Sequence, residues 1–367
     1  MTDIGSTGLR KRLSSPLTLG ALAVAIVIAK TGFGLFPEWR RFADATLVWP
    51  DFGASPALTE ADATLVSNSA GAWLLGALGF RGPTPYLVGS LLLVVIALLL
   101  PFLMPITRDG ETRPHLPRLL FVIVAGGAVA PVLLSWIGSY DALIVIAATI
   151  AALSRNRWFS AAGWCLLGVA HAAVALVALA LWLPMAWVTR PHEEHRRRIT
   201  RLAMACVALA VGWLSIRAVS DAWGGSTDRW QLFRRLDPSD VLHAYAAGWP
   251  LVLFGALGVV WLIVLRREVR RTVPGRLLLT EAVLSAFVLP LVAVDETRIT
   301  VLCLLASTLT WAAWTARMSP ATPAVTEQWR TYALAAAVVP VMVVWQGTVL
   351  YPGWDLLRTL QTSGLLP

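Results

Sequence analysis

The sequence predicts an all-α protein built as a polytopic bundle of transmembrane helices, with about eleven membrane segments. Hydrophobic residues fill 57% of its 367 positions and charged residues only 14%, whereas a soluble domain uses about 25% charged residues. The mean hydropathy is +0.69. A soluble enzyme and a disordered chain are therefore excluded, and a lipid bilayer is the expected solvent.

Long apolar runs provide the second observation, because a helix needs about 20 residues to cross about 30 Å of hydrocarbon. The runs lie at residues 17–36, 84–106, 118–137, 140–154, 158–170, 171–189, 201–219, 246–265, 277–293, 298–315 and 331–351. The first follows a basic stretch, as a signal peptide would, but no clean cleavage pattern follows it. We therefore expect an uncleaved first helix.

The run at residues 158–189 is too long for one upright helix and short for two. Arg155 and Arg157 precede it, and Arg190 and the basic stretch 196–201 follow it. Both flanks favour the cytoplasmic side, since basic loops concentrate there. We therefore expect the chain to cross and return as two short helices inside the bundle, with His171 at the turn.

The sequence has no internal repeat and no low-complexity linker, which predicts a single transmembrane domain over residues 1–367. The excess of Arg over Lys and the high Ala content indicate a bacterial cytoplasmic membrane. The charge pattern predicts that the N-terminus lies inside, and that the tail from Pro352 and the long loops 37–83 and 220–245 lie outside. The first loop should end in an amphipathic helix on the membrane, capped by Asn68 or Ser69. The net charge of +9 is interpreted as an orientation signal and predicts no nucleic-acid binding.

Charged residues within membrane helices, or at their ends, are the first candidates for function in a bilayer protein. In the first outer loop, Asp44 and Asp51 could supply a general base, although a solvated loop explains them equally well. At the outer end of the run 140–154, Asp141 is a candidate for catalysis. Its alternative role is to stabilise the helix N-terminus, with Ser139 as the cap.

His171 could act as a base or grip a phosphate at the outer turn, or it could be a neutral, hydrogen-bonded histidine of the bundle. Lys30 and Arg217 place positive charge at outer helix ends, where they could receive a lipid-linked diphosphate. Snorkelling to the interface is the alternative for both.

The tight turn at residues 294–298 holds Asp295, Glu296 and Arg298 between two apolar runs. The planar fork of Arg298 suits a phosphate or diphosphate, while an ordinary turn with a salt bridge is the alternative. The three cysteines show no metal-ligand spacing, and the acids match no metal motif. A divalent metal cofactor is therefore left open, without a predicted site.

The stretch Ser139–Trp187 resembles the central segment of polytopic GT-C glycosyltransferases. It contains SYDALIVIAATIAALSRNRWFSAAGWCLLGVAHAAVALVALALWLP, with an outer Asp141, an apolar helix, a short basic turn, a Gly-containing hairpin and a helix ending in Leu-Pro. Within that group, the placing of His171 and Arg298 looks more like EpsG-like and O-antigen-polymerase-like proteins.

The resemblance implies sugar transfer from a polyprenyl-phosphate-linked donor to a glycan or lipid acceptor, or polymerisation of lipid-linked units, at the outer face. It also implies a catalytic acid in the first outer loop, which points to Asp44 or Asp51. The paired acids common in such loops are absent, and the nearest pattern is Glu60-Ala61-Asp62. Arginines would stabilise the departing phosphate.

Two other classes remain open from the sequence. A lipid or glycolipid transporter would need charge near the membrane midplane and usually an internal repeat, and Glu281 is the nearest candidate. A non-catalytic scaffold for envelope assembly, embedded among membrane lipids, is the other. A Ser139–His171 protease dyad lacks the expected GxSG motif.

Overall fold

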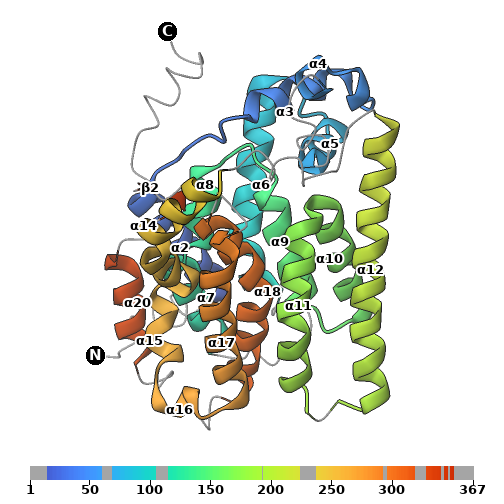
Figure 1. The fold of residues 1–367 in the computed structure, drawn as a ribbon. Helices are drawn as coiled ribbons and strands as arrows, with labels where there is room; N and C mark the ends of the chain where they lie inside the picture. The colour runs from blue at the N-terminus through green and yellow to red at the C-terminus, as the bar shows by residue number, and fades with distance from the viewer. Residues whose placement is uncertain are drawn as a thin grey trace, which may run out of the picture.

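The computed structural model is a helical bundle (Figure 1). It describes residues 15–59, 68–104, 115–191, 193–223, 237–291, 296–318, 328–339, 343–345 and 348–350. The helices of the bundle are α2 (Pro16–Thr31), α6 (Pro83–Leu103), α7 (Leu116–Gly126), α8 (Val129–Ser135), α9 (Asp141–Leu153), α10 (Arg157–Ala170), α11 (Ala172–Val188), α12 (His195–Ala222), α14 (Pro238–Leu257), α15 (Trp261–Val264), α16 (Arg267–Arg270), α17 (Val273–Val288), α18 (Glu296–Arg317) and α20 (Trp329–Val338).

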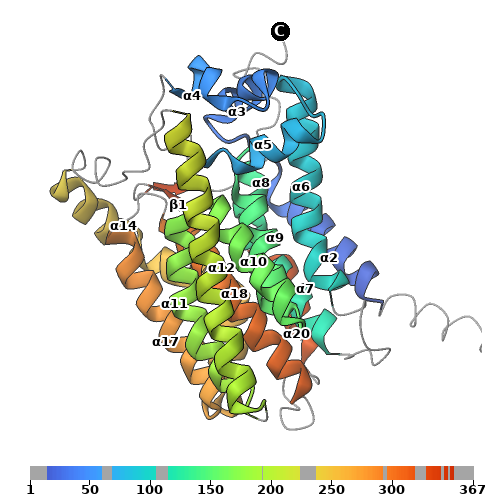
Figure 2. The same ribbon diagram turned by 90° about the vertical axis from the view of Figure 1, so that its right-hand side faces the viewer.

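Short elements complete the described structure. Residues of the first long loop form α3 (Trp39–Ala45), η1 (Thr46–Val48), η2 (Phe52–Ala54), α4 (Pro56–Thr59) and α5 (Ala70–Ala77). Two further short helices, η4 (Gly258–Val260) and η5 (Leu289–Leu291), follow α14 and α17, and the strands β1 (Val343–Trp345) and β2 (Thr348–Leu350) pair antiparallel. The first-loop elements lie together at one end of the bundle in both views (Figure 2).

Helix α18 is the centre of the bundle and α12 is at its rim. Of the apolar window of α18, 89% is buried, against 22% for α12. In α12, Val207, Val211 and Leu214 are exposed, as side chains that face lipid would be. The described helices therefore have the apolar exterior expected of a membrane protein.

The expected count of eleven crossings is not supported. Four described helices are long and apolar enough to cross a membrane: α6, α12, α17 extended through η5, and α18. The pair α7 and α8 makes a fifth if it is one span bent by 48°. Helices α2, α9 and α11 and residues 248–264 are apolar but shorter. Apolar runs overcount because helices inside a protein can be short, broken or tilted.

The predicted hairpin around His171 is confirmed. His171 ends α10 and begins α11 with extended backbone angles, and its Nδ1 accepts the N–H of Val174. One pocket is lined by Arg155, which precedes α10, by Thr189, which follows α11, and by Arg317 at the end of α18. The beginning of α10 and the end of α11 therefore lie at the same end of the bundle, so the chain reverses.

Two other sequence expectations are wrong. Helix α5 follows Ser69 as expected, but it is apolar all round: it buries Ala72 and Leu75 and leaves Trp73 exposed. It is therefore not amphipathic. The run 331–351 is also not one helix, because α20 ends at Val338 and the strands β1 and β2 follow. β-Branched valines at 339, 341, 343 and 344 favour strand over helix.

Close packing of α10 against α12 depends on glycine. A Cβ on Gly212 would lie 2.0 Å from the carbonyl oxygen of Cys165, and one on Gly168 would lie 2.5 Å from that of Leu209. Backbone cannot yield as a flexible side chain can, and small residues let membrane helices approach in this way.

We predict that Gly212→Ala separates α10 from α12 and lowers the free energy of unfolding by about 1–3 kcal/mol. Unfolding in detergent, followed by circular dichroism, measures this. Gly71→Ala is the matched control, because a Cβ there meets only the Cα of Tyr140, at 3.8 Å. Equal stability of the two variants would contradict the packing argument.

Candidate functional site

A buried ion pair joins α9 to α18. Arg298 donates from Nε to Asp141 Oδ2 and from Nη2 to Asp141 Oδ1, each at 2.7 Å. The exposed fraction is 0% for the Asp141 side chain and 3% for Arg298. The sequence indicated Asp141 and Arg298 as two separate candidates. In the structure they form a bidentate contact, the strongest geometry available to an arginine and a carboxylate.

Aromatic rings enclose the guanidinium. The Arg298 Cζ lies 4.2 Å from the ring centroid of Trp136 and 5.0 Å from that of Tyr140. The ring of His171 lies 5.3 Å from that of Tyr140. The sequence candidates Asp141, His171 and Arg298 therefore meet in one cluster, which we call the ion-pair cluster together with Trp136 and Tyr140.

A tight turn positions the acid of this pair. Gly138 has φ +93°, which favours glycine, and a Cβ there would clash with Trp39. Its carbonyl accepts a hydrogen bond from Tyr86 Oη. The Oγ of Ser139 then accepts the N–H of Asp141, which begins α9. Asp141 thus lies in the first turn of α9, where the helix dipole favours its negative charge.

The connection between α2 and α3 packs against the turn that contains Gly138. The ring of Phe36 lies 5.7 Å from Trp136 and 6.5 Å from Tyr140. The N–H of Phe36 is bonded to the carbonyl of Ile137. The chain leaving α2 is therefore fastened directly to the turn that carries the cluster.

The first turn of α18 supplies the basic partner. Glu296, Thr297 and Arg298 are all buried there, so Glu296, predicted as a binding residue, lies on the same helix turn as Arg298. Asp295 falls outside the described residues. The tight turn expected at 294–298 therefore gives way to helix from Glu296 onward.

The two first-loop acids lie outside the ion-pair cluster. Asp44 is half-buried on α3, whose buried face carries Trp39 and Phe42. Asp51 is exposed, and its Oδ1 accepts the N–H of Gly53 at the start of η2. Both belong to the end of the bundle formed by α3, α4 and α5 (Figure 1).

Lys30 and Arg217 also have separate surroundings. The Nζ of Lys30 donates to the carbonyls of Ala125, at 3.1 Å, and Ala336, at 2.6 Å. These carbonyls lie near the C-termini of α7 and α20, where helix dipoles favour a cation. Arg217 is exposed on α12 and lies 3.8 Å from Asp221 one turn later. Both cations therefore already have local partners.

Sequence reasoning missed the aromatic residues and the pairing itself. Trp136 and Tyr140 flank a Gly-Ser turn, and neither residue predicts a contact with an arginine so distant in the sequence. Within the described part of the chain, no three His, Cys, Asp or Glu side chains gather as a metal site.

The geometry has a defined chemical meaning. A guanidinium that is bound by a carboxylate and packs against two aromatic rings is fixed in place, and a fixed cation stabilises developing negative charge without reorganisation. The pair also neutralises two charges that would be very unfavourable separately inside an apolar bundle.

No protein-family profile, curated protein or solved structure matches the chain.

We predict that Asp141→Asn lowers the free energy of unfolding by about 3–5 kcal/mol, because it leaves Arg298 charged and buried without its partner carboxylate. Chemical unfolding in detergent micelles measures the loss. Asp221→Asn breaks an exposed pair and should change stability little. A similar small effect in both variants would show that the buried pair does not hold the fold.

Proposed function

We propose that this chain is a membrane glycosyltransferase or polysaccharide polymerase that uses a polyprenyl-phosphate-linked sugar donor. The acceptor would be a glycan or a lipid in the cell envelope. The observation that carries the proposal is the meeting of Asp141, His171 and Arg298, each chosen separately from the sequence, in one cluster at the end bearing the first loop.

The proposed roles follow from burial and position. Arg298 is the fixed cation that favours the departing phosphate, and Asp141 is a positioning residue that orients Arg298. The general base is Asp44 or Asp51, since these acids are accessible in the covering loop. The base would take the proton of the acceptor hydroxyl as its oxygen attacks the anomeric carbon, and the lipid phosphate would leave.

A lipid donor also needs space for its apolar chain. A cavity of about 550 Å³ lies among α14, η4, α15 and α17, and all of its lining residues are apolar. They include Phe254, Trp261, Leu262, Leu279 and Val283. This cavity supports a substrate with a long hydrocarbon portion.

The activity test uses membranes that contain the full chain and a panel of radiolabelled polyprenyl-phosphate sugars. We predict that one of the two variants, Asp44→Asn or Asp51→Asn, removes the general base. That variant should lower the rate of sugar transfer about 10²–10⁴-fold and leave the stability of the protein unchanged. Arg298→Lys should also lower transfer, because lysine lacks the planar fork.

Asp221→Asn is the matched control for the loop acids, because Asp221 is an exposed carboxylate near the same end that has no role in the proposed chemistry. Full activity in both loop variants would remove the first loop from the mechanism. No transfer from any donor by the unmodified chain would contradict the proposed function.

We further propose that the end formed by α3–α5 faces outward in a bacterial cytoplasmic membrane, with the N-terminus inside and the C-terminal tail outside. The opposite end carries Arg155, Arg190, Arg201 and Arg317, and loops rich in arginine stay in the cytoplasm.

This orientation predicts the labelling of single cysteines in a variant without Cys165, Cys206 and Cys303. An impermeant maleimide should label Arg41→Cys on intact cells and Arg196→Cys only after permeabilisation. Both positions are exposed, and they lie at opposite ends of the bundle, on α3 and at the start of α12. The reverse pattern would invert the topology and move the proposed chemistry to the cytoplasm.

A further inference from the structure

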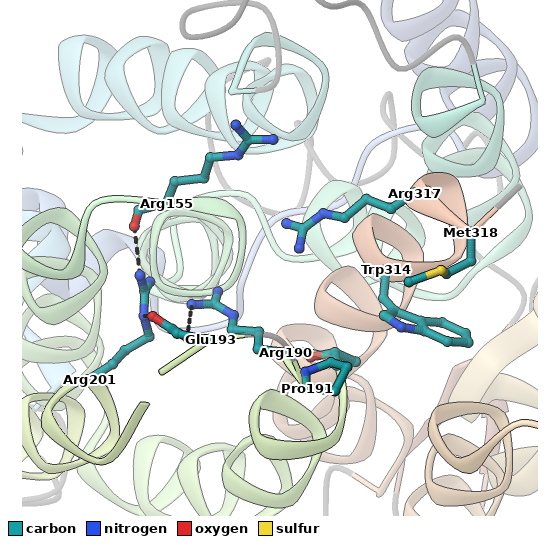
Figure 3. Close-up of a pocket in the computed structure, with 9 residues that line it drawn as sticks. Arg155, Arg190, Pro191, Glu193, Arg201, Trp314, Arg317 and Met318 are labelled. Carbon is teal, nitrogen blue, oxygen red and sulfur yellow. Dashed lines mark hydrogen bonds and ion pairs between the residues drawn. The ribbon is translucent and has the colours of Figure 1, made fainter. Parts of the chain in front are cut away.

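A pocket of about 350 Å³ with several arginines in its lining lies at the end of the bundle opposite the ion-pair cluster. Figure 3 shows its lining residues. Its walls come from the turn before α10, the connection between α11 and α12, α12 itself and the end of α18. The lining residues are Arg155, Thr189, Arg190, Pro191, Glu193, Arg201, Trp314, Arg317 and Met318. The lining thus holds four arginines and one glutamate, and Arg190 and Arg201 lie against that glutamate. We call this space the arginine pocket.

A second cavity of about 400 Å³ shares Arg155, Glu193 and Arg201 with the arginine pocket, and adds Arg157 and Arg197. The described residues around the two cavities therefore include six arginines and the single acid Glu193. Among the described lining residues, arginines therefore outnumber acids.

The inner residues of the pocket are fixed by contacts rather than freely solvated. Arg201 donates to the carbonyls of Ser154 and Arg155 and lies 3.6 Å from Glu193. Arg190 lies 3.8 Å from the same glutamate. The exposed fractions of the Arg190 and Arg201 side chains are only 13% and 11%. One carboxylate therefore serves two largely buried guanidinium groups.

The connection between α11 and α12 is also held in place. Arg198 donates to the carbonyls of Pro191 and Glu193, and its guanidinium lies 4.5 Å from the ring centroid of Trp187. This wall of the pocket is therefore shaped before any ligand binds, which limits the ordering needed on binding.

Burial and neighbouring positive charge lower the pKa of Arg190. Burial has the largest effect, the charges of Arg201 and Arg317 act in the same direction, and Glu193 opposes them, which leaves the pKa at about 10. Orientation of a membrane protein requires arginines only to lie in the loops. It does not require them to be buried beside one another, so the orientation rule alone does not explain this arrangement.

The ligand chemistry follows from the residue types. A guanidinium group can donate two parallel hydrogen bonds to two oxygens of one phosphate. An anion bound here would also relieve the repulsion among the arginines. One side of the pocket carries the apolar groups Trp314, Met318 and Pro191. Basic pockets between membrane helices on the cytoplasmic side suit the head groups of anionic lipids.

We propose that the arginine pocket binds a phosphate group, carried by the head group of an anionic membrane lipid, at the end of the bundle opposite the ion-pair cluster. The site is distinct from the proposed donor site and stands whether or not the chain transfers sugar. Free diphosphate is the other source of the same chemistry.

The test measures binding by the purified full chain in neutral detergent. Native mass spectrometry and thermal stability would be recorded with phosphatidylglycerol, with phosphatidylcholine and with inorganic pyrophosphate. The double variant Arg155→Gln, Arg317→Gln removes two exposed pocket arginines. Arg196→Gln, Arg276→Gln removes the same charge from exposed positions outside both cavities.

We expect phosphatidylglycerol, and not phosphatidylcholine, to bind and stabilise the unmodified chain. Its affinity should fall about fivefold for each pocket arginine removed and much less in the control. Stabilisation by pyrophosphate with the same dependence on Arg155 and Arg317 would assign the phosphate to a soluble ligand as well. Equal binding by the pocket and control variants, or no binding of either anion, would overturn the proposal.

Glu193→Gln provides a test in the opposite direction. It keeps the shape of the side chain and removes the one negative charge that lines both cavities. Tighter binding of phosphatidylglycerol is expected. Unchanged or weaker binding, in a variant with unaltered helicity, would contradict the charge argument even if the arginine variants fail to fold.

Discussion

The contact between Asp141 and Arg298 is the constraint around which the bundle is arranged. Two full charges inside an apolar protein require each other, since the effective cost of removing one from water is several kcal/mol. Asp141 begins α9 and Arg298 lies in the first turn of α18, the most buried of the candidate spans. The pair therefore sets the register of these two central helices, and the helices around them pack against a fixed pair.

The two ends of the bundle use arginine in different ways. In the ion-pair cluster, the guanidinium of Arg298 binds the carboxylate of Asp141 and packs against Trp136 and Tyr140. In the arginine pocket, Arg190 and Arg201 share Glu193 while further arginines line the same space. The first arrangement fixes a cation in position. The second gathers more arginines than acids among the residues that the structure describes, which favours an added anion.

Local sequence predicted those parts of the fold whose cause is itself local. The reversal at His171 followed from basic residues on both flanks of one apolar run, and Asp141 and Arg298 were candidates because charge is rare in such runs. Their pairing spans 157 positions and has no local signal. The break between α7 and α8 depends on distant packing as well, since Gly126 meets Gly258 and Val259. Apolar runs therefore predicted helices better than crossings.

The buried pair also bears on the choice between a transferase and a transporter. Alternating access requires helices on two sides of a central site to move apart, and α9 and α18 are joined directly by Asp141 and Arg298. Opening a path between them would separate two desolvated charges, at a cost of several kcal/mol. Group transfer at one end needs no such separation, because a rigid pair is an advantage when it holds a cation for a leaving phosphate. The geometry of α9 and α18 therefore favours chemistry at a fixed site over movement through the bundle.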